Sequence, residues 1–429
     1  MQRLPTEIHD RIVSYVKCFE EIPKYEDPCL YPPMYLIHKD ARTALSNLRL
    51  VDKTFSRSAS RALFGGARAL LGHGVSSISK LETLSSSRYA QHVRLIQFDI
   101  GDKDLDDLLR DEISEEEHEE HEDVQEEVDE GGNFRLSGKA VNRLSSLITE
   151  FRNLKAVSIW PKEFVPLEKA IGFLSQIIIT IADLESRGVI HKVTNLRLPL
   201  DGATHLITLL DNGDHQTDIR NFLQHVQNLD FMGFIGVADS IGAPTGLTDL
   251  DTLIKSSSNL LSLSILGDLT LISFVKFDLG LRLRLESLKL CELEITSYDL
   301  LALLEACKES MRFISLDYLE LVSGSWLHVL VQIKKNLTKL NTFFFMPSDP
   351  YLDELGSEDP EFEVCFLWHA LGDIQRQTNS NRIAAGLKPW TSKTYLHLNY
   401  PPLEVITNNK YYEELISQKW DAENSTSHC

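Results

Sequence analysis

Several chemical signatures are missing from this 429-residue sequence. Its six cysteines form no CxxC pair and show no regular spacing, so we expect neither a disulfide framework nor a zinc site. No apolar run reaches the roughly 18 residues that indicate a membrane-spanning helix. The chain opens Met-Gln-Arg-Leu-Pro, without the apolar stretch that is typical of a signal peptide. We therefore expect a cytoplasmic or nuclear protein with no membrane partner.

Motifs for catalysis are missing as well. The sequence contains no GxxxxGK[ST], no HExxH, no GxSxG and no set of kinase motifs. His118 and His121 lie among carboxylates, but a charged tether does not supply the supporting partners that a metal site needs. We expect no enzymatic activity, no catalytic residue, no cofactor and no metal.

The net charge of −20 is unevenly distributed. Residues 102 to 130 hold 17 acidic residues against Lys103 and Arg110, which gives a local charge of −15. The rest of the chain has 41 basic and 46 acidic residues and so carries only −5. This remainder lacks the basic surface that nucleic-acid binding requires, so we expect no nucleic-acid partner. The acidic stretch, taken as residues 102–132, is predicted to be a disordered loop.

The N-terminal region predicts three short amphipathic helices. Pro5 suits the first turn of a helix, and Ile8 and Ile12 recur on one face of it. After a proline-rich insertion at residues 18–39, two further apolar stripes precede the Gly-Gly pair at residues 65–66. None of these helices can bury its apolar face alone, so we expect them to pack together.

Two separate blocks of this region resemble the F-box. The first reads Leu-Pro-x-Glu-Ile followed by a spaced Ile, and the second reads Leu-Arg-Leu-Val with an aromatic residue four positions later. The closing Ala-x-x-x-Leu-Phe resembles the variant that is common in filamentous fungi, whereas the insertion departs from the usual short loop. The resemblance implies docking on a Skp-type adaptor. It assigns adaptor binding to Leu4, Pro5, Glu7, Ile8, Ile12, Leu48, Leu50, Val51 and Phe55.

From residue 67 to residue 346 the sequence alternates helical patterns with short strand patterns of the form apolar-x-x-apolar-x-apolar. The central residues of these triplets lie 24 to 39 positions apart, which resembles leucine-rich repeats of irregular length. The resemblance implies an α/β solenoid with one continuous core, and an ordinary parallel α/β sheet is the alternative. The predicted triplets are Leu154/Val157/Ile159, Val193/Leu196/Leu198, Val226/Leu229/Phe231, Leu260/Leu263/Ile265, Leu285/Leu288/Leu290, Leu316/Leu319/Leu321 and Leu340/Phe343/Phe345. Another strand is predicted at residues 92–100.

Residues 347–429 form a predicted C-terminal segment in which the repeat pattern is lost. We expect a helix at residues 366–374, a strand at 394–398 and a final helix at 411–420 that covers the last repeat.

Aromatic residues gather near the end of the repeats. Phe344 is expected to face away from the core side shared by its two neighbours, because side chains alternate along a strand. Aromatic side chains are enriched at binding hot spots, so we predict that Phe344, Trp390 and Tyr395 bind a target protein. The alternative is that they are buried under the C-terminal segment.

The expected fold class is α/β, with a three-helix F-box at residues 1–66 followed by an irregular leucine-rich-repeat-like solenoid. The F-box resemblance implies the substrate-recognition subunit of an SCF-type cullin–RING ubiquitin ligase, with the cullin ligase core and an unknown target protein as partners. Two other functions stay open. One is an interaction scaffold without ubiquitin transfer, and the other is an acidic-loop binder of basic nuclear proteins.

Overall fold

The computed structural model describes residues 5–17, 39–71, 76–100, 138–161, 167–200, 206–210, 215–233, 250–272, 282–347 and 360–390. The predicted acidic loop and nearly all of the N-terminal insertion lie outside these residues. The strand predicted at 394–398, the helix predicted at 411–420, Leu4 and Tyr395 also lie outside them.

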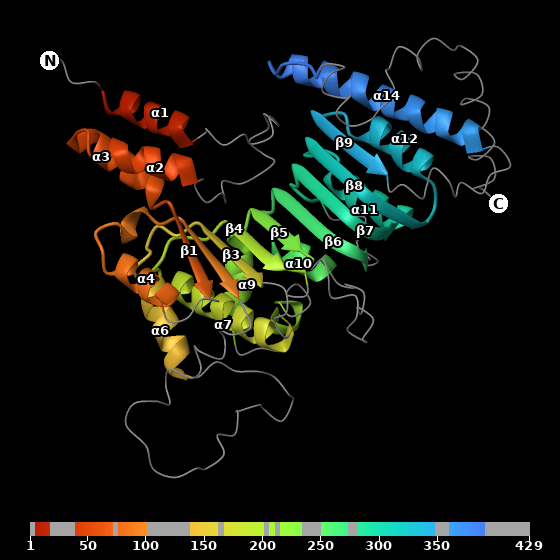
Figure 1. Ribbon diagram of the computed structural model, residues 1–429. Coiled ribbons are helices and arrows are strands. Elements are labelled where there is room, and N and C mark those ends of the chain that lie inside the picture. Colours follow the sequence, from red (N-terminus) through yellow and green to blue (C-terminus); the bar gives the residue numbers. More distant parts are fainter. Residues whose placement is uncertain are drawn as a thin grey trace. The chain divides into compact units, whose positions relative to one another are not determined.

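The chain divides into two compact units, and each combines helices with strands (Figure 1). The first unit comprises residues 1–241 and 252–262, and the second comprises residues 242–251 and 263–429. The elements of the first are α1 (Thr6–Lys17), α2 (Lys39–Leu48), α3 (Lys53–Leu63), β1 (Gly66–Leu71), α4 (Ser76–Ser85), the 3-10 helix η1 (Ala90–His92), β2 (Leu95–Ile100), α6 (Gly138–Thr149), β3 (Ala156–Pro161), α7 (Leu167–Ser186), β4 (Asn195–Pro199), α9 (Gln216–His225) and β5 (Asn228–Met232). Those of the second are β7 (Ser287–Thr296), α11 (Ser297–Cys307), β8 (Phe313–Ser323), α12 (Trp326–Asn336), β9 (Thr342–Pro347) and α14 (Pro360–Ala384). Helix α10 (Leu250–Ser256) and strand β6 (Ser262–Ile272) cross the boundary between the units.

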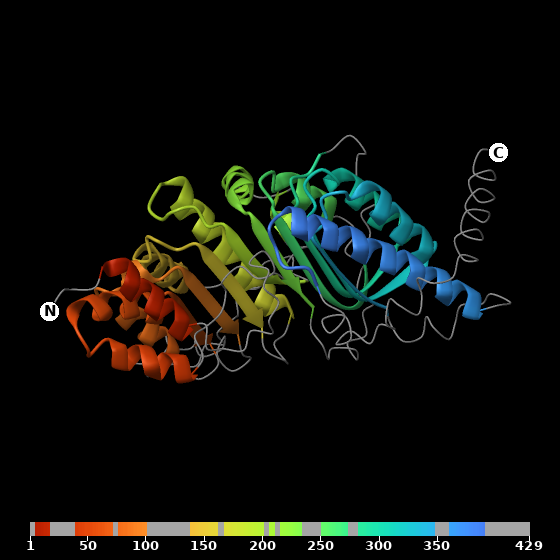
Figure 2. The same ribbon diagram turned by 90° about the horizontal axis from the view of Figure 1, so that it is seen from above.

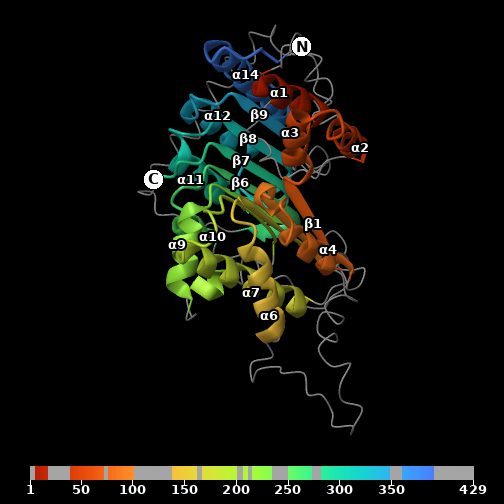
Figure 3. The ribbon, with the colours of Figure 1, turned by 90° about the vertical axis from the view of Figure 1, so that its left-hand side faces the viewer.

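The sheets are parallel, and their strands follow one another in chain order. In the first unit the order is β1-β2-β3-β4-β5, and in the second β6 precedes β7, β8 and β9. Parallel neighbours need a crossover connection, and helices supply it. Figure 3 shows α6, α7 and α9 on one face of the first unit's sheet. The expected α/β class is therefore confirmed.

The apolar triplets predicted from the sequence form the cores of these units. All seven triplets are buried, with exposed fractions between 0% and 8%. The strand register aligns their central residues, as in the row formed by Val157, Leu196 and Leu229. Each strand therefore continues the apolar layer of its neighbour. The predicted strand at residues 92–100 is β2, whose Ile96 extends the same row.

The triplet predicted in β8 is wrong in its register. Ile314 pairs with Leu288 on one side and with Phe343 on the other, so the equivalent triplet is Met311/Ile314/Leu316. All three of these residues are fully buried. The proposed residues Leu319 and Leu321 are also buried, but they lie further along the same strand.

A shift in side-chain alternation explains this second buried pair. Glu292 of β7 and Tyr318 of β8 both have φ of 54°, a left-handed conformation that is unusual for residues other than glycine. Up to these positions every second residue of the strand is buried, and across each of them the next buried residue comes three positions later. Leu293 and Leu319 consequently join the buried layer after Leu290 and Leu316. No sequence pattern had indicated these irregularities.

Strand β1 was not predicted. Its sequence, Gly-Ala-Arg-Ala-Leu-Leu, lacks the β-branched and aromatic residues that favour strands. It forms because β2 supplies a continuous parallel partner from Leu95 to Ile100. The Gly-Gly pair thus ends α3 and begins a strand.

Helix α14 is longer than the helix predicted at residues 366–374. It begins at Pro360, which fits the first helical turn, and it contacts α12 and β9. It buries Leu371 and Ile374, and Asn381 Nδ2 donates hydrogen bonds to the carbonyl oxygens of Thr338 and Leu340 at 2.9 and 2.8 Å. Helix α14 therefore covers the last strand and helix of the repeat pattern. No helix in the described ranges is long and apolar enough to cross a membrane.

Gly267→Ala should destabilise the protein by about 1–3 kcal/mol, the usual cost of overpacking a core. A Cβ atom at this position would lie 2.1 Å from Leu293 Cδ2 and 2.7 Å from the carbonyl oxygen of Glu292. Ser264→Ala, in the same strand, serves as the control and should cost much less. Urea denaturation measures both free energies of unfolding, and equal stabilities of the two variants would contradict the packing at Gly267.

Candidate protein-binding surfaces

The three N-terminal helices pack around a small core of their own. Val13, Leu45 and Ala59, one from each helix, are at most 5% exposed. Leu48, Phe55, Ala62 and Leu63 pack against them while remaining partly exposed. Figure 2 shows α1, α2 and α3 grouped together, coloured red to orange. The packing predicted from their amphipathic patterns is thereby confirmed.

Three large apolar side chains of this group remain on the surface. Ile8 of α1 is 40% exposed, and Leu50 and Val51, in the turn after α2, are 84% and 64% exposed. In the described part of the first unit, these are the large hydrophobic residues that stay exposed. Exposed apolar groups that gather at one place commonly mark a protein-binding surface.

Polar contacts bring the segments carrying these residues together. His9, which follows Ile8, is 4% exposed, and its Nε2 lies 3.9 Å from Oδ2 of Asp52, which follows Val51. The His9 ring also packs edge-on against Phe55 at 4.4 Å between centroids. The start of α1 and the turn between α2 and α3 are therefore neighbours.

Two further interactions hold this arrangement. Asp52 caps α3, because its Oδ1 accepts hydrogen bonds from the backbone N–H groups of Thr54 and Phe55 at 2.7 and 2.8 Å. Ser58 Oγ donates to Asp10 Oδ1 at 2.6 Å, which joins α3 to α1. Sequence reasoning missed these residues, although an aspartate directly before an apolar stripe is a recognisable cap.

The residues predicted to bind an adaptor therefore fall into two groups. Pro5, Glu7, Ile8, Leu50 and Val51 are exposed. The other described members, Ile12, Leu48 and Phe55, are partly buried, and the last two pack against the small core.

A stacked cluster joins α2 and α3 to the beginning of the repeat region. The rings of Phe64 and Tyr89 stack at 4.3 Å, and the Arg49 guanidinium lies 5.3 and 5.1 Å from their centroids. Arg49 and Arg88 also donate hydrogen bonds to the Tyr89 hydroxyl at 2.7 and 2.9 Å. The hydrogen bond from Arg88, aided by the charge of Arg49, lowers the pKa of Tyr89. This cluster fixes the helices against the turn that precedes β2, and nothing in the sequence had predicted it.

The aromatic residues predicted to bind a target pack against one another in the second unit. Phe344 is partly exposed on the side opposite Phe343 and Phe345, as expected. Its ring meets Trp390 edge-on at 5.4 Å, and the Arg382 guanidinium lies 4.8 Å from the Trp390 centroid. The segment after α14 thus covers part of Phe344.

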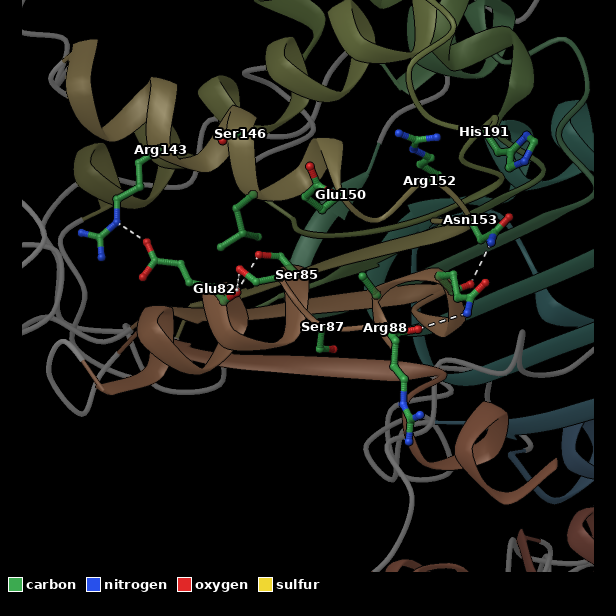
Figure 4. Close-up of a pocket in the computed structure, with 14 residues that line it drawn as sticks. Glu82, Ser85, Ser87, Arg88, Arg143, Ser146, Glu150, Arg152, Asn153 and His191 are labelled. Carbon is green, nitrogen blue, oxygen red and sulfur yellow. Dashed lines mark hydrogen bonds and ion pairs between the residues drawn. The ribbon is translucent and has the colours of Figure 1, made fainter. Parts of the chain in front are cut away.

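A polar groove of about 1080 Å³ opens in the first unit between α4 and α6 (Figure 4). Arg143 Nε donates to Glu82 Oε1 at 2.6 Å across it, and Asn153 Nδ2 donates to the carbonyl oxygen of Gln91 at 2.7 Å. These bonds link α4 and η1 to α6 and the turn after it. The groove contains none of the residues predicted to bind partners.

The described residues hold no group of three or more histidine, cysteine, aspartate or glutamate side chains that could bind a metal ion. The chain matches no protein-family model and no curated protein. Its functional assignment therefore depends on its own residues.

Asp52→Ala should destabilise the N-terminal helices by about 0.5–2 kcal/mol, because α3 loses its cap. Asp52→Asn, which keeps a capping oxygen, is the matched variant and should lose less. Helix content followed by circular dichroism during urea denaturation provides the measurement. If the alanine variant were as stable as the asparagine variant, the cap would contribute nothing.

Proposed function

We propose that this protein is the substrate-recognition subunit of an SCF-type ubiquitin ligase. Its first three helices form an F-box that docks on a Skp-type adaptor, and its strand–helix repeats hold a target protein. The protein carries out no bond chemistry itself. Its contribution is proximity, because a target held near the conjugating enzyme no longer depends on a bimolecular encounter.

The observation that carries this proposal is the exposure of Ile8, Leu50 and Val51. The F-box resemblance assigns these same residues to adaptor binding. Complete burial of such a side chain is worth roughly 1.5–3 kcal/mol, and these three, 40% to 84% exposed, have part of that still to gain, which together offsets some of the cost of association. Their segments lie against each other at His9, which approaches Asp52 and packs on Phe55, so the surface exists before a partner arrives.

The repeat region supports the solenoid in this proposal. Successive strands place their apolar triplets in one register, as leucine-rich repeats do. Asparagine side chains add hydrogen bonds between successive strand–helix units. Asn228 Nδ2 donates to Asn195 Oδ1 at 2.5 Å. Asn259 Nδ2 donates to the carbonyl oxygen of Gln224 at 2.7 Å. These bonds tie consecutive repeats together outside the strand ladder.

The double variant Ile8→Asp with Leu50→Asp should abolish co-purification with the adaptor, because docking would bury unpaired charge. Val322→Asp changes another exposed valine, 45% exposed in the second unit, and should bind normally. Circular dichroism must show that all variants are folded. Undiminished adaptor binding by the folded double variant would falsify the assignment.

Recovery of the adaptor without the cullin would instead favour a scaffold that transfers no ubiquitin.

The proposed target-binding residues can be tested by Phe344→Ala and Trp390→Ala, each scored for capture of target proteins from the native host. Either change should reduce capture severalfold, because large aromatic side chains dominate binding hot spots. Tyr298→Ala, at an exposed aromatic residue elsewhere in the second unit, is the control. Capture by both variants at the level of the control would place the target elsewhere, provided that adaptor binding is unchanged.

A further inference from the structure

Four polar residues of the first unit stand in one row across four neighbouring strands. The register pairs Gln97 of β2 with Ser158 of β3, Ser158 with Arg197 of β4, and Arg197 with Asp230 of β5. Each residue lies between two buried apolar residues of its own strand. Because side chains alternate along a strand, the row projects from the face opposite the apolar core.

Ser158 has the shortest side chain of the row. It lies between the longer side chains of Gln97 and Arg197, on adjacent strands about 4.8 Å away. Two residues earlier, β3 contributes another small side chain, Ala156, to the same face. Arg197 and Asp230 keep 22% and 15% of their side-chain surface exposed, so solvent reaches this end of the row.

Arg197 is held in place by one hydrogen bond, and its other side-chain N–H donors are unused within the described residues. Its Nε donates to Asp230 Oδ2 at 2.6 Å. Its terminal nitrogens make no hydrogen bond to any described residue. A guanidinium carries five N–H donors and no acceptor, so an anchored arginine of this kind can still bind an oxygen ligand.

Ser158 presents a second unused donor beside it. The residue is 2% exposed, and its Oγ has no hydrogen-bond partner among the described residues. A buried hydroxyl without a partner destabilises a protein, and alanine would fill the same place without that cost. A ligand that accepts a hydrogen bond from the hydroxyl would give the serine a function.

We propose that this row binds an oxyanion, a carboxylate or a phosphate, carried by a protein segment that lies against the sheet. Arg197 supplies charge and N–H donors, Ser158 donates its hydroxyl, and Asp230 positions the guanidinium. Both unused groups can donate hydrogen bonds, the guanidinium can only donate them, and the acid of the row is already engaged by Arg197. A ligand that only accepts hydrogen bonds therefore fits, and charge-assisted hydrogen bonds are the strong ones. The inference does not depend on the adaptor-binding function.

The test uses immobilised degenerate peptide libraries, probed with the whole protein at fixed ionic strength. Four libraries carry Glu, Gln, phosphoserine or Ser at a fixed central position. We expect about tenfold stronger binding of Glu over Gln or of phosphoserine over Ser, which corresponds to about 1.4 kcal/mol. The pair that shows the preference identifies the source of the oxyanion.

Variants of the row residues test whether the row causes the preference for Glu or phosphoserine peptides. Ser158→Ala and Arg197→Gln should each remove it, and Ser158→Ala should leave Tm unchanged or raise it. Ser257→Ala is the matched control, because Ser257 is 1% exposed, its Oγ also lacks a partner among the described residues, and it lies in the loop before β6. This control should keep the preference.

The proposal is overturned if the unmodified protein shows no preference, or if the preference survives Ser158→Ala or Arg197→Gln. Normal adaptor binding by these variants would keep the result separate from the F-box assignment.

Discussion

The alternation of side chains along parallel strands is the constraint on which the rest of this structure depends. Every second residue of a strand must be apolar, because it faces the core of its unit. The register then aligns residues such as Val157 and Leu196 between neighbouring strands. The intervening residues of each strand face the other side of the sheet and can be polar. The row from Gln97 to Asp230 consists of such residues. One rule thus determines both the core and the polar row on the opposite face.

The N-terminal helices depend on a different interaction. Their own core is small, and it leaves Ile8, Leu50 and Val51 outside. The cluster of Arg49, Phe64 and Tyr89 attaches them to the turn before β2 through stacking and hydrogen bonds. Arg49 directly precedes Leu50, so the exposed apolar surface lies next to the cluster that anchors it. A protein bound there would be held in a defined orientation to β1 and β2, as the proposed function requires.

Much of the fold could be predicted from the sequence, because apolar periodicity reports burial directly. The triplets of β3, β4, β5, β6, β7 and β9 are examples. The failures have physical causes. In β8 two apolar triplets overlap on one strand, and periodicity alone cannot choose between Leu316/Leu319/Leu321 and Met311/Ile314/Leu316. Strand β1 forms through pairing with β2 and has no strong strand propensity of its own.

The candidate site was predicted only in part for a related reason. A motif names the residues that matter but does not separate those that face a partner from those that pack inside. Leu48 and Phe55 pack against the helix core, whereas Leu50 and Val51 are exposed. His9, Tyr89 and Arg197 act through partners 33 to 43 positions away in the chain, and local patterns cannot show such contacts.

Hydrogen exchange of the whole protein, measured with and without the purified adaptor of its native host, tests the central claim most directly. We predict slower exchange in α1 and in residues 48–55 when the adaptor is bound, and no change in β3, β4 and β5. Protection confined to the strands, or no protection of α1 in a complex that demonstrably forms, would contradict it.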